Sequence, residues 1–218
     1  MSSQILIDPI IDARESFNDR VAETEAYFSF LHNVLSGDTG IQIPAELRYT
    51  LTSVGYLVLY NLVESTSRVY LKLIHQSMIC ERIALEETTD LIRNVVLDGF
   101  RKNKPSAAFI SSLSDLKTQI MSECYDEDTF FSGNVDAKLL RKIAAKYGFS
   151  APKSCYGLLE IKNKRNDLAH GKKSFVECSK HEAEETIVKF KESIIKYLST
   201  LSDSIELFVK NKNYKKTT

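Results

Sequence analysis

The stretch KNKRNDLAHG, residues 162–171, decides how the rest of this chain is interpreted. On a helix, at about 100° per residue, an apolar face forms around it. That face consists of Leu158, Ile161, Leu168 and Ala169, and Arg165 falls in its middle. Since an isolated buried charge is too costly to keep, this arginine must be paired or must face a cleft or an interface.

The last residues of the stretch predict where the helix ends. Asn166 and His170 are four residues apart, so they are neighbours on one flank of a helix. Gly171 is typical of the position just past a helix end, which places His170 in the last turn. There the helix dipole favours a protonated imidazole.

These residue types suit a phosphodiester substrate. Arginine donates two parallel hydrogen bonds to a phosphate, and histidine changes charge near neutral pH. We therefore expect Arg165 to stabilise charge growing on phosphorus while His170 moves a proton. The cations expected to bind RNA phosphates beside them are Lys162, Lys164, Lys172 and Lys173.

One histidine supplies only part of the acid–base catalysis that the reaction needs. Cleavage of RNA through its own 2′-OH needs one group to take a proton and another to give one. A homodimer would bring two copies of the motif together and complete the site.

Two structural interpretations stay open. The segment RNDLAHG is also compatible with a plain helix end, in which Arg165 bonds a buried carboxylate and His170 caps carbonyl groups. Glu64 and Arg68 lie four residues apart, which favours an intrahelical ion pair. The functional alternative is that Glu64 orients Arg165.

Composition predicts one soluble, all-α domain over residues 1–218, with a flexible lead-in (1–11) and a flexible basic tail (210–218). Of the 218 residues, 43% are hydrophobic and 27% charged, and eight glycines and four prolines are few turn formers. Lys plus Arg equals Asp plus Glu at 29 each, so only a local basic patch can argue for nucleic-acid binding.

Apolar periodicity and capping residues predict the helices along the chain. Asp12 and Pro44 suit the starts of the first two helices, and Asp136 and Gly148 bracket a later one. Phe130 and Phe131 suit either a cap on the core or a partner surface, and the core is favoured. The predicted spans are 12–35, a central helix over 45–76, 81–102, 107–123, 137–147, the motif helix, a connector over 174–178, and a last helix capped by Ser179 and Glu182.

The apolar positions of that last helix alternate threes and fours: Ile187, Phe190, Ile194, Tyr197, Leu201 and Phe208. This spacing suits either a helix of the bundle or a dimer seam, and a bundle helix is favoured for a single element.

Other classes of site find little support. Four scattered cysteines predict reduced, mostly buried thiols, and Cys178 with His181 is at most half of a metal site. No phosphate-binding loop, dinucleotide fingerprint, serine hydrolase elbow or zinc protease motif occurs, so we expect no metal and no cofactor. The amino terminus is unlike a signal peptide and no apolar run spans a membrane, which favours a cytoplasmic protein.

The motif residues resemble the Arg-x(4–6)-His signature of HEPN domains (higher eukaryotes and prokaryotes nucleotide-binding). Arg165 and His170 have the required spacing, and the polar Asn166 directly follows the arginine. The wider block RNDLAHGKKSF (165–175) and the upstream SGNVDAKLLRKIAAKYG (132–148) are similar to a prokaryotic HEPN subgroup.

This resemblance implies an α-helical bundle and a metal-independent endoribonuclease. Such proteins are usually homodimers with facing motifs, and they occur as toxins and in phage defence, where an antitoxin or another defence protein is a partner. Carried over by position, Arg165 would contact the scissile phosphate, His170 would be the acid–base residue, and Asn166 would position RNA or His170. Since some HEPN domains are non-catalytic, the alternative is a helical interaction or nucleotide-binding module.

Overall fold

The computed structural model describes residues 8–36, 42–103, 131 and 134–217, which are helical apart from turns, loops and one isolated bridge. This confirms the expected all-α class. A single 3-10 turn, η1, covers Leu85–Glu87. The described residues form seven α-helices: α1 (Pro9–Ser36), α2 (Ala45–Cys80), α3 (Asp90–Asn103), α7 (Ala137–Tyr147), α8 (Leu158–Ala169), α9 (Phe175–Ser179) and α10 (Glu184–Lys210).

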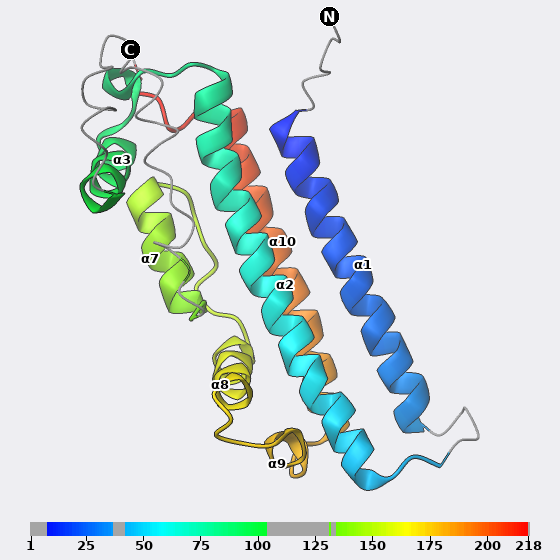
Figure 1. Cartoon of the computed structure of the whole chain (residues 1–218). Coiled ribbons are helices and arrows are strands. Elements are labelled where there is room, and N and C mark those ends of the chain that lie inside the picture. The colour runs from blue at the N-terminus through cyan, green and yellow to red at the C-terminus, as the bar shows by residue number, and fades with distance from the viewer. Residues whose placement is uncertain (1–7, 37–41, 104–130, 132–133, 218) are drawn as a thin grey trace, which may run out of the picture.

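Three long helices form the body of the molecule, and α2 lies at its centre. Helix α1 runs antiparallel to α2 and α10, which run in the same direction (Figure 1). The shorter helices α3, α7, α8 and α9 lie along one side of this body. Helix α2 contacts α1, α8, α9 and α10, so it is the element against which the motif helix is positioned.

The sequence of α2 explains its central place. Pro44 precedes its first residue, Ala45, as predicted, because proline suits a helix start, and the helix continues to Cys80 rather than ending near residue 76. Apolar and aromatic side chains point in more than one direction, and Tyr56, Leu59 and Ile74 are all fully buried.

The last helix, α10, is a helix of the bundle. All six apolar positions of its predicted repeat are buried in the core of the single chain. The dimer-seam interpretation of this repeat is therefore wrong, since the apolar face is already covered within the monomer.

Helix α1 begins earlier than predicted, at Pro9 rather than Asp12. The carboxylate of Asp8 accepts a hydrogen bond from the Ile10 amide at 2.9 Å, and Pro9 occupies the first helical position. Asp12 lies in the first turn instead. Within the lead-in predicted to be flexible, residues 9–11 are therefore helical.

The helix predicted over 81–102 is wrong in its first nine residues. Arg82 adopts a left-handed conformation (φ 52°), which ends α2, and α3 begins only at Asp90. The intervening segment pairs with the carboxyl-terminal tail: the Thr89 amide donates to the Tyr214 carbonyl, and the Lys216 amide donates to the Glu87 carbonyl. Sequence periodicity could not reveal this pairing between distant segments.

The same contacts correct the prediction of a flexible tail. Tyr214 is completely buried and packs against the Phe208 ring, with 6.2 Å between ring centroids. Residues 211–215 therefore fold back against the segment that follows α2, and the buried Tyr214 side chain anchors the tail despite its basic residues.

Helix α7 confirms its predicted boundaries. The Asp136 carboxylate accepts a hydrogen bond from the Leu139 amide at 2.8 Å, and Gly148 is the C-cap. Phe131 is buried, as expected for a residue capping the core. Phe130 and the helix predicted over 107–123 lie outside the described residues.

The connector between α8 and α10 is a short helix rather than an irregular segment. Ser174 caps α9 and forms a capping box with Glu177. The capping box predicted for Ser179 and Glu182 does not form, because Ser179 donates to the Tyr49 carbonyl at 2.7 Å and Glu182 pairs with a lysine of α8. Helix α10 starts at Glu184 without a side-chain cap.

Gly157 controls the start of the motif helix, and its replacement by alanine is expected to destabilise the fold. Its φ is 80°, and a Cβ atom there would lie 2.1 Å from the Phe190 ring. We expect Gly157→Ala to lower the free energy of unfolding by about 3 kcal/mol, from left-handed strain plus overpacking. Gly171→Ala is the matched control: φ is 64° but no atom lies within 4 Å, so the loss should be about 1 kcal/mol. If urea unfolding gave equal losses of unfolding free energy for the two variants, this role of Gly157 would be contradicted.

Candidate functional site

The motif helix α8 ends as the sequence predicts. His170 is its C-cap residue and is exposed, and its amide donates to the Asn166 carbonyl at 3.0 Å. Gly171 follows in the left-handed conformation, and the Lys172 amide donates back to the Asp167 carbonyl at 2.8 Å. These local bonds present the imidazole to solvent at the end of a well-defined helix.

The buried charge of this helix is Lys164, whereas the sequence pattern predicted Arg165. Lys164 is only 9% exposed, while Arg165 lies half-buried on the neighbouring flank. The inward side of α8 is wider than the apolar pattern indicates, because α9 and the segment before α10 cover the side on which Lys164 lies. A helix does not by itself determine how much of its surface its neighbours cover.

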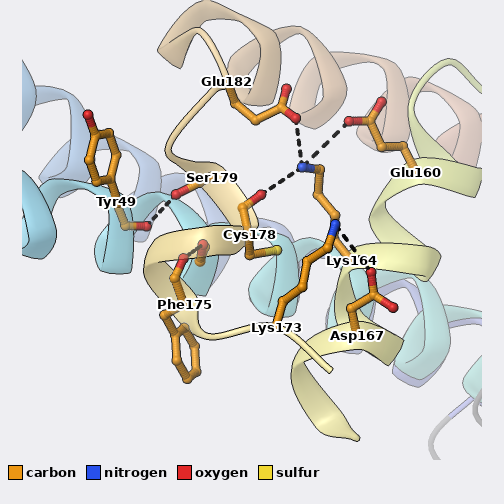
Figure 2. A network of polar contacts seen from close by, with 10 residues as sticks. Tyr49, Glu160, Lys164, Asp167, Lys173, Phe175, Cys178, Ser179 and Glu182 are labelled. Atoms are coloured by element: carbon orange, nitrogen blue, oxygen red, sulfur yellow. Dashed lines mark hydrogen bonds and ion pairs between the residues drawn. The ribbon is translucent and has the colours of Figure 1, made fainter. Parts of the chain in front are cut away.

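Three protein groups surround the Lys164 ammonium (Figure 2). Its Nζ donates to Glu182 Oε1 and to the Cys178 carbonyl, both at 2.8 Å, and lies 3.8 Å from Glu160 Oε1. It also lies 4.8 Å from the centre of the Tyr56 ring. Such a cage supplies the partners that a desolvated cation requires.

Further polar contacts join this cage to the central helix. On α9, the Phe175 carbonyl accepts a hydrogen bond from Ser53 of α2 at 2.5 Å, and Ser179 donates to the Tyr49 carbonyl of α2. At the edge, Lys173 Nζ lies 3.6 Å from the Asp167 carboxylate (Figure 2). The segment after His170 is therefore fastened to α2 at several points.

Arg165 lies on an aromatic platform supplied by α2. Its guanidinium carbon is 4.9 Å from the centre of the Tyr60 ring, and Nη1 donates to Asn166 Oδ1 at 3.1 Å. Asn166 in turn donates from Nδ2 to Asn134 Oδ1 at 2.9 Å. This chain of contacts restricts the orientation of two predicted site residues before any substrate binds.

Tyr60 supports the site with both of its ends. While the ring carries Arg165, the hydroxyl accepts a hydrogen bond from the Val135 amide at 2.9 Å. Burial raises the pKa of Tyr60, and the Glu64 charge adds to this, whereas the Val135 hydrogen bond and the Arg165 and Arg68 charges oppose it. The phenol is thus a neutral support at physiological pH.

Three of the four predicted phosphate-binding lysines have partners within the protein. Lys162 Nζ lies 2.6 Å from Asp136 Oδ2 and Lys164 is caged, so their charges hold helices together. Lys172 and Lys173 are exposed next to His170, and Lys173 pairs with Asp167 at 3.6 Å. Glu64 bonds Arg68 at 3.0 Å, which confirms the intrahelical ion pair. The role of Glu64 in orienting Arg165 stays a prediction.

Sequence reasoning missed Tyr56, Tyr60, Asn134 and Glu182. The two tyrosines, four residues apart, share one face of α2 and receive the consecutive cations Lys164 and Arg165. That spacing was visible in the sequence, but its match to α8 depends on which helices pack together. Asn134 and Glu182 lie in connecting segments without a periodic signal.

The described residues offer no alternative metal centre. No group of three His, Cys, Asp or Glu side chains that could hold a metal ion occurs among them, so Cys178 and His181 are not part of such a group there. Cys80 is exposed, Cys155 half-buried and Cys178 buried, all as free thiols, while Cys124 lies outside the described residues.

Among the described residues, no helix combines the length and the apolar character that crossing a bilayer requires.

Comparison with known proteins identifies one family. The chain matches the family described as HEPN_MAE_28990-like HEPN over residues 13–214, from the first turns of α1 to the tail. No curated protein and no solved structure matches the chain.

Replacing Lys164 with methionine is expected to destabilise the fold because Glu182 and the Cys178 carbonyl would lose their buried partner. We expect the free energy of unfolding, measured in urea, to fall by about 2–3 kcal/mol. This is at or below the lower end of the range for a broken buried ion pair, because the Glu182 side chain is 29% exposed. Lys173→Met is the matched control: Lys173 is 51% exposed, so the loss should stay under about 1 kcal/mol. A Lys164→Met protein as stable as the control would show that the cage contributes nothing.

Proposed function

The chain belongs to the HEPN_MAE_28990-like HEPN family, and on that premise we propose that it is a metal-independent endoribonuclease. One observation carries the proposal: α8 presents Arg165, Asn166 and His170 from its last turns, with the arginine held on Tyr60 and the histidine exposed. A positioned guanidinium beside a solvent-facing imidazole suits charge stabilisation and proton transfer at a phosphodiester.

The proposed reaction uses the RNA's own 2′-hydroxyl. A base takes the 2′-OH proton as that oxygen attacks phosphorus, and the bond to the 5′-oxygen breaks as an acid protonates it. The products are a 2′,3′-cyclic phosphate and a 5′-hydroxyl, so atoms and charge balance without a co-reactant. His170 supplies the proton transfers, and Arg165 donates to the phosphate oxygens on which negative charge grows.

Asn166 has a positioning role in this scheme. Its amide oxygen accepts from Arg165 and its amide nitrogen donates to Asn134, so one side chain orients the guanidinium against a fixed loop. Arg165 approaches its substrate with part of its conformational freedom already restricted, which lowers the entropy cost of binding a phosphate. The exposed Lys172 extends the positive charge beyond His170, whereas the charge of Lys173 is partly offset by Asp167 at 3.6 Å.

We further propose that two chains combine their motifs. Each copy offers one histidine for a reaction that needs an acid and a base, and His170 lies on an outer surface where a second copy has access. The family membership supports a role in toxin–antitoxin or phage-defence biology, with an antitoxin or another defence protein as partner. A non-catalytic interaction or nucleotide-binding module is the alternative, and the assays below separate the two.

Purified protein should degrade RNA in EDTA, and the site variants should not. Loss of general acid–base catalysis predicts that His170→Ala lowers the cleavage rate by about 10²-fold or more. Arg165→Lys should also lose most activity, because a lysine keeps the charge but not the planar fork. His32→Ala is the matched control, since His32 is another exposed histidine remote in sequence from the motif.

Comparing RNA cleavage by the wild type and these variants tests the proposal. Cleavage products should carry 2′,3′-cyclic phosphate ends, and His32→Ala should cleave as wild type does. If wild type and all variants cleave equally, a contaminant is responsible and the nuclease assignment fails. If the folded wild type cleaves no RNA, the non-catalytic alternative is correct.

Mixing subunits tests the composite site. A fixed amount of wild type, equilibrated with a tenfold excess of His170→Ala, should lose most of its activity because nearly every wild-type chain then pairs with an inactive one. The same excess of Arg165→Ala/His170→Ala should act alike. Activity unchanged by the excess, under conditions where chains exchange, would show that each copy acts alone.

A further inference from the structure

Helix α7 exposes a row of cations that the site described above does not use. Its sequence AKLLRKIAAKY contains no acidic residue. At helical spacing, one face is buried and the opposite face is basic. The buried face consists of Leu140, Ile143, Ala144 and Tyr147, and the exposed face, which we call the basic stripe, consists of Lys138, Arg141, Lys142 and Lys146.

The charges of the basic stripe are not neutralised within the described part of the chain. None of its four cations forms an ion pair with a described carboxylate, although other exposed cations do, including Arg20, Arg101 and Lys212. Arg141 donates a hydrogen bond to the Lys153 carbonyl, which fixes a further exposed lysine beside the stripe. Although the chain has zero net charge, this concentration of positive charge produces a local electrostatic field that attracts anions.

The stripe begins next to the proposed catalytic site. Asp136, the N-cap of α7, pairs with Lys162 of α8 at 2.6 Å. The two preceding residues contact the site directly, since Asn134 holds Asn166 and the Val135 amide bonds Tyr60. Figure 1 shows α7 leading away from α8 along the same side of the molecule.

The dimensions suit a nucleic-acid backbone. Lys138 and Lys146 are eight residues apart, which is about 12 Å along a helix. A nucleic-acid strand in helical form advances about 3.4 Å per phosphate, so the stripe spans roughly three phosphates. Long lysine and arginine side chains on a rigid helix give contacts to the backbone that do not depend on base sequence.

We propose that the basic stripe of α7 binds the RNA backbone next to the cleaved phosphodiester, an inference that rests on the function proposed above. Lys162 and Lys164, the lysines inside the motif, hold α8 in place, and the stripe supplies the phosphate contacts instead. The substrate would be single-stranded RNA that extends from His170 past Asn134 and along α7.

The test is RNA binding by the full-length chain in a His170→Ala background. The stripe variant is Lys142→Gln/Lys146→Gln, and the matched control is Lys72→Gln/Lys189→Gln, which removes two exposed lysines that the described structure leaves without an ion pair. Glutamine keeps helix propensity, and helical content by circular dichroism verifies folding. The probe is a fluorescent single-stranded RNA titrated at about 50 to 200 mM KCl.

Loss of two phosphate contacts predicts a clear result. The slope of log affinity against log salt should fall by about 1.4, and affinity near 0.1 M salt should fall roughly 25-fold in the stripe variant. The control should bind as the parent does, and Lys142→Arg/Lys146→Arg should retain binding. Equal weakening of stripe variant and control, or no weakening of either, would overturn the proposal.

Two further arms separate the alternatives. If the stripe variant keeps its RNA affinity but loses binding to phosphatidylserine vesicles, the surface is a membrane contact and the proposal is overturned. If wild type cleaves RNA while the stripe variant binds as tightly as its parent, the nuclease stands and the stripe proposal fails. If wild type cannot cleave RNA but the stripe variant loses RNA binding, the stripe proposal stands and the nuclease fails.

Discussion

The desolvated ammonium of Lys164 is the constraint on which the functional side of this molecule depends. A cation removed from water must find acceptors, and this one finds Glu182, the Cys178 carbonyl and the face of Tyr56. These groups belong to three separate elements, α2, α9 and the segment before α10, and Lys164 itself belongs to a fourth, α8. Satisfying one charge therefore sets the mutual position of all four.

The same arrangement positions Arg165. Lys164 and Arg165 are consecutive, and they meet Tyr56 and Tyr60 on consecutive turns of α2 at 4.8 and 4.9 Å. The first cation is buried and structural, whereas the second is half-buried and keeps access to solvent. The two adjacent cations thus differ in role: Lys164 is structural and Arg165 keeps access to solvent. The reason is that α9 covers one flank of α8 and leaves the other open.

Charge neutrality conceals an uneven distribution of charge. Many exposed cations are matched by nearby carboxylates, and the motif lysines Lys162 and Lys164 are matched as well. Exposed cations without an ion pair among the described residues also occur elsewhere, as at Lys72 and Lys189, but α7 carries four of them on one face. A local field of this kind acts on a polyanion at short range, and salt screens it beyond about 10 Å. Net charge is therefore a poor guide to whether this protein binds RNA.

Local sequence signals determined the all-α class and several helix ends. Asp136 and Gly148 bracket α7, Pro44 precedes α2, and His170 with Gly171 closes α8, because caps are satisfied by residues within one turn. Only the tertiary structure decided that α8 buries Lys164 rather than Arg165, that Ser179 bonds Tyr49 instead of capping α10, and that Tyr214 holds down the tail. In each of these cases the deciding partner lies far away in sequence, and a side chain's burial depends on what packs over it.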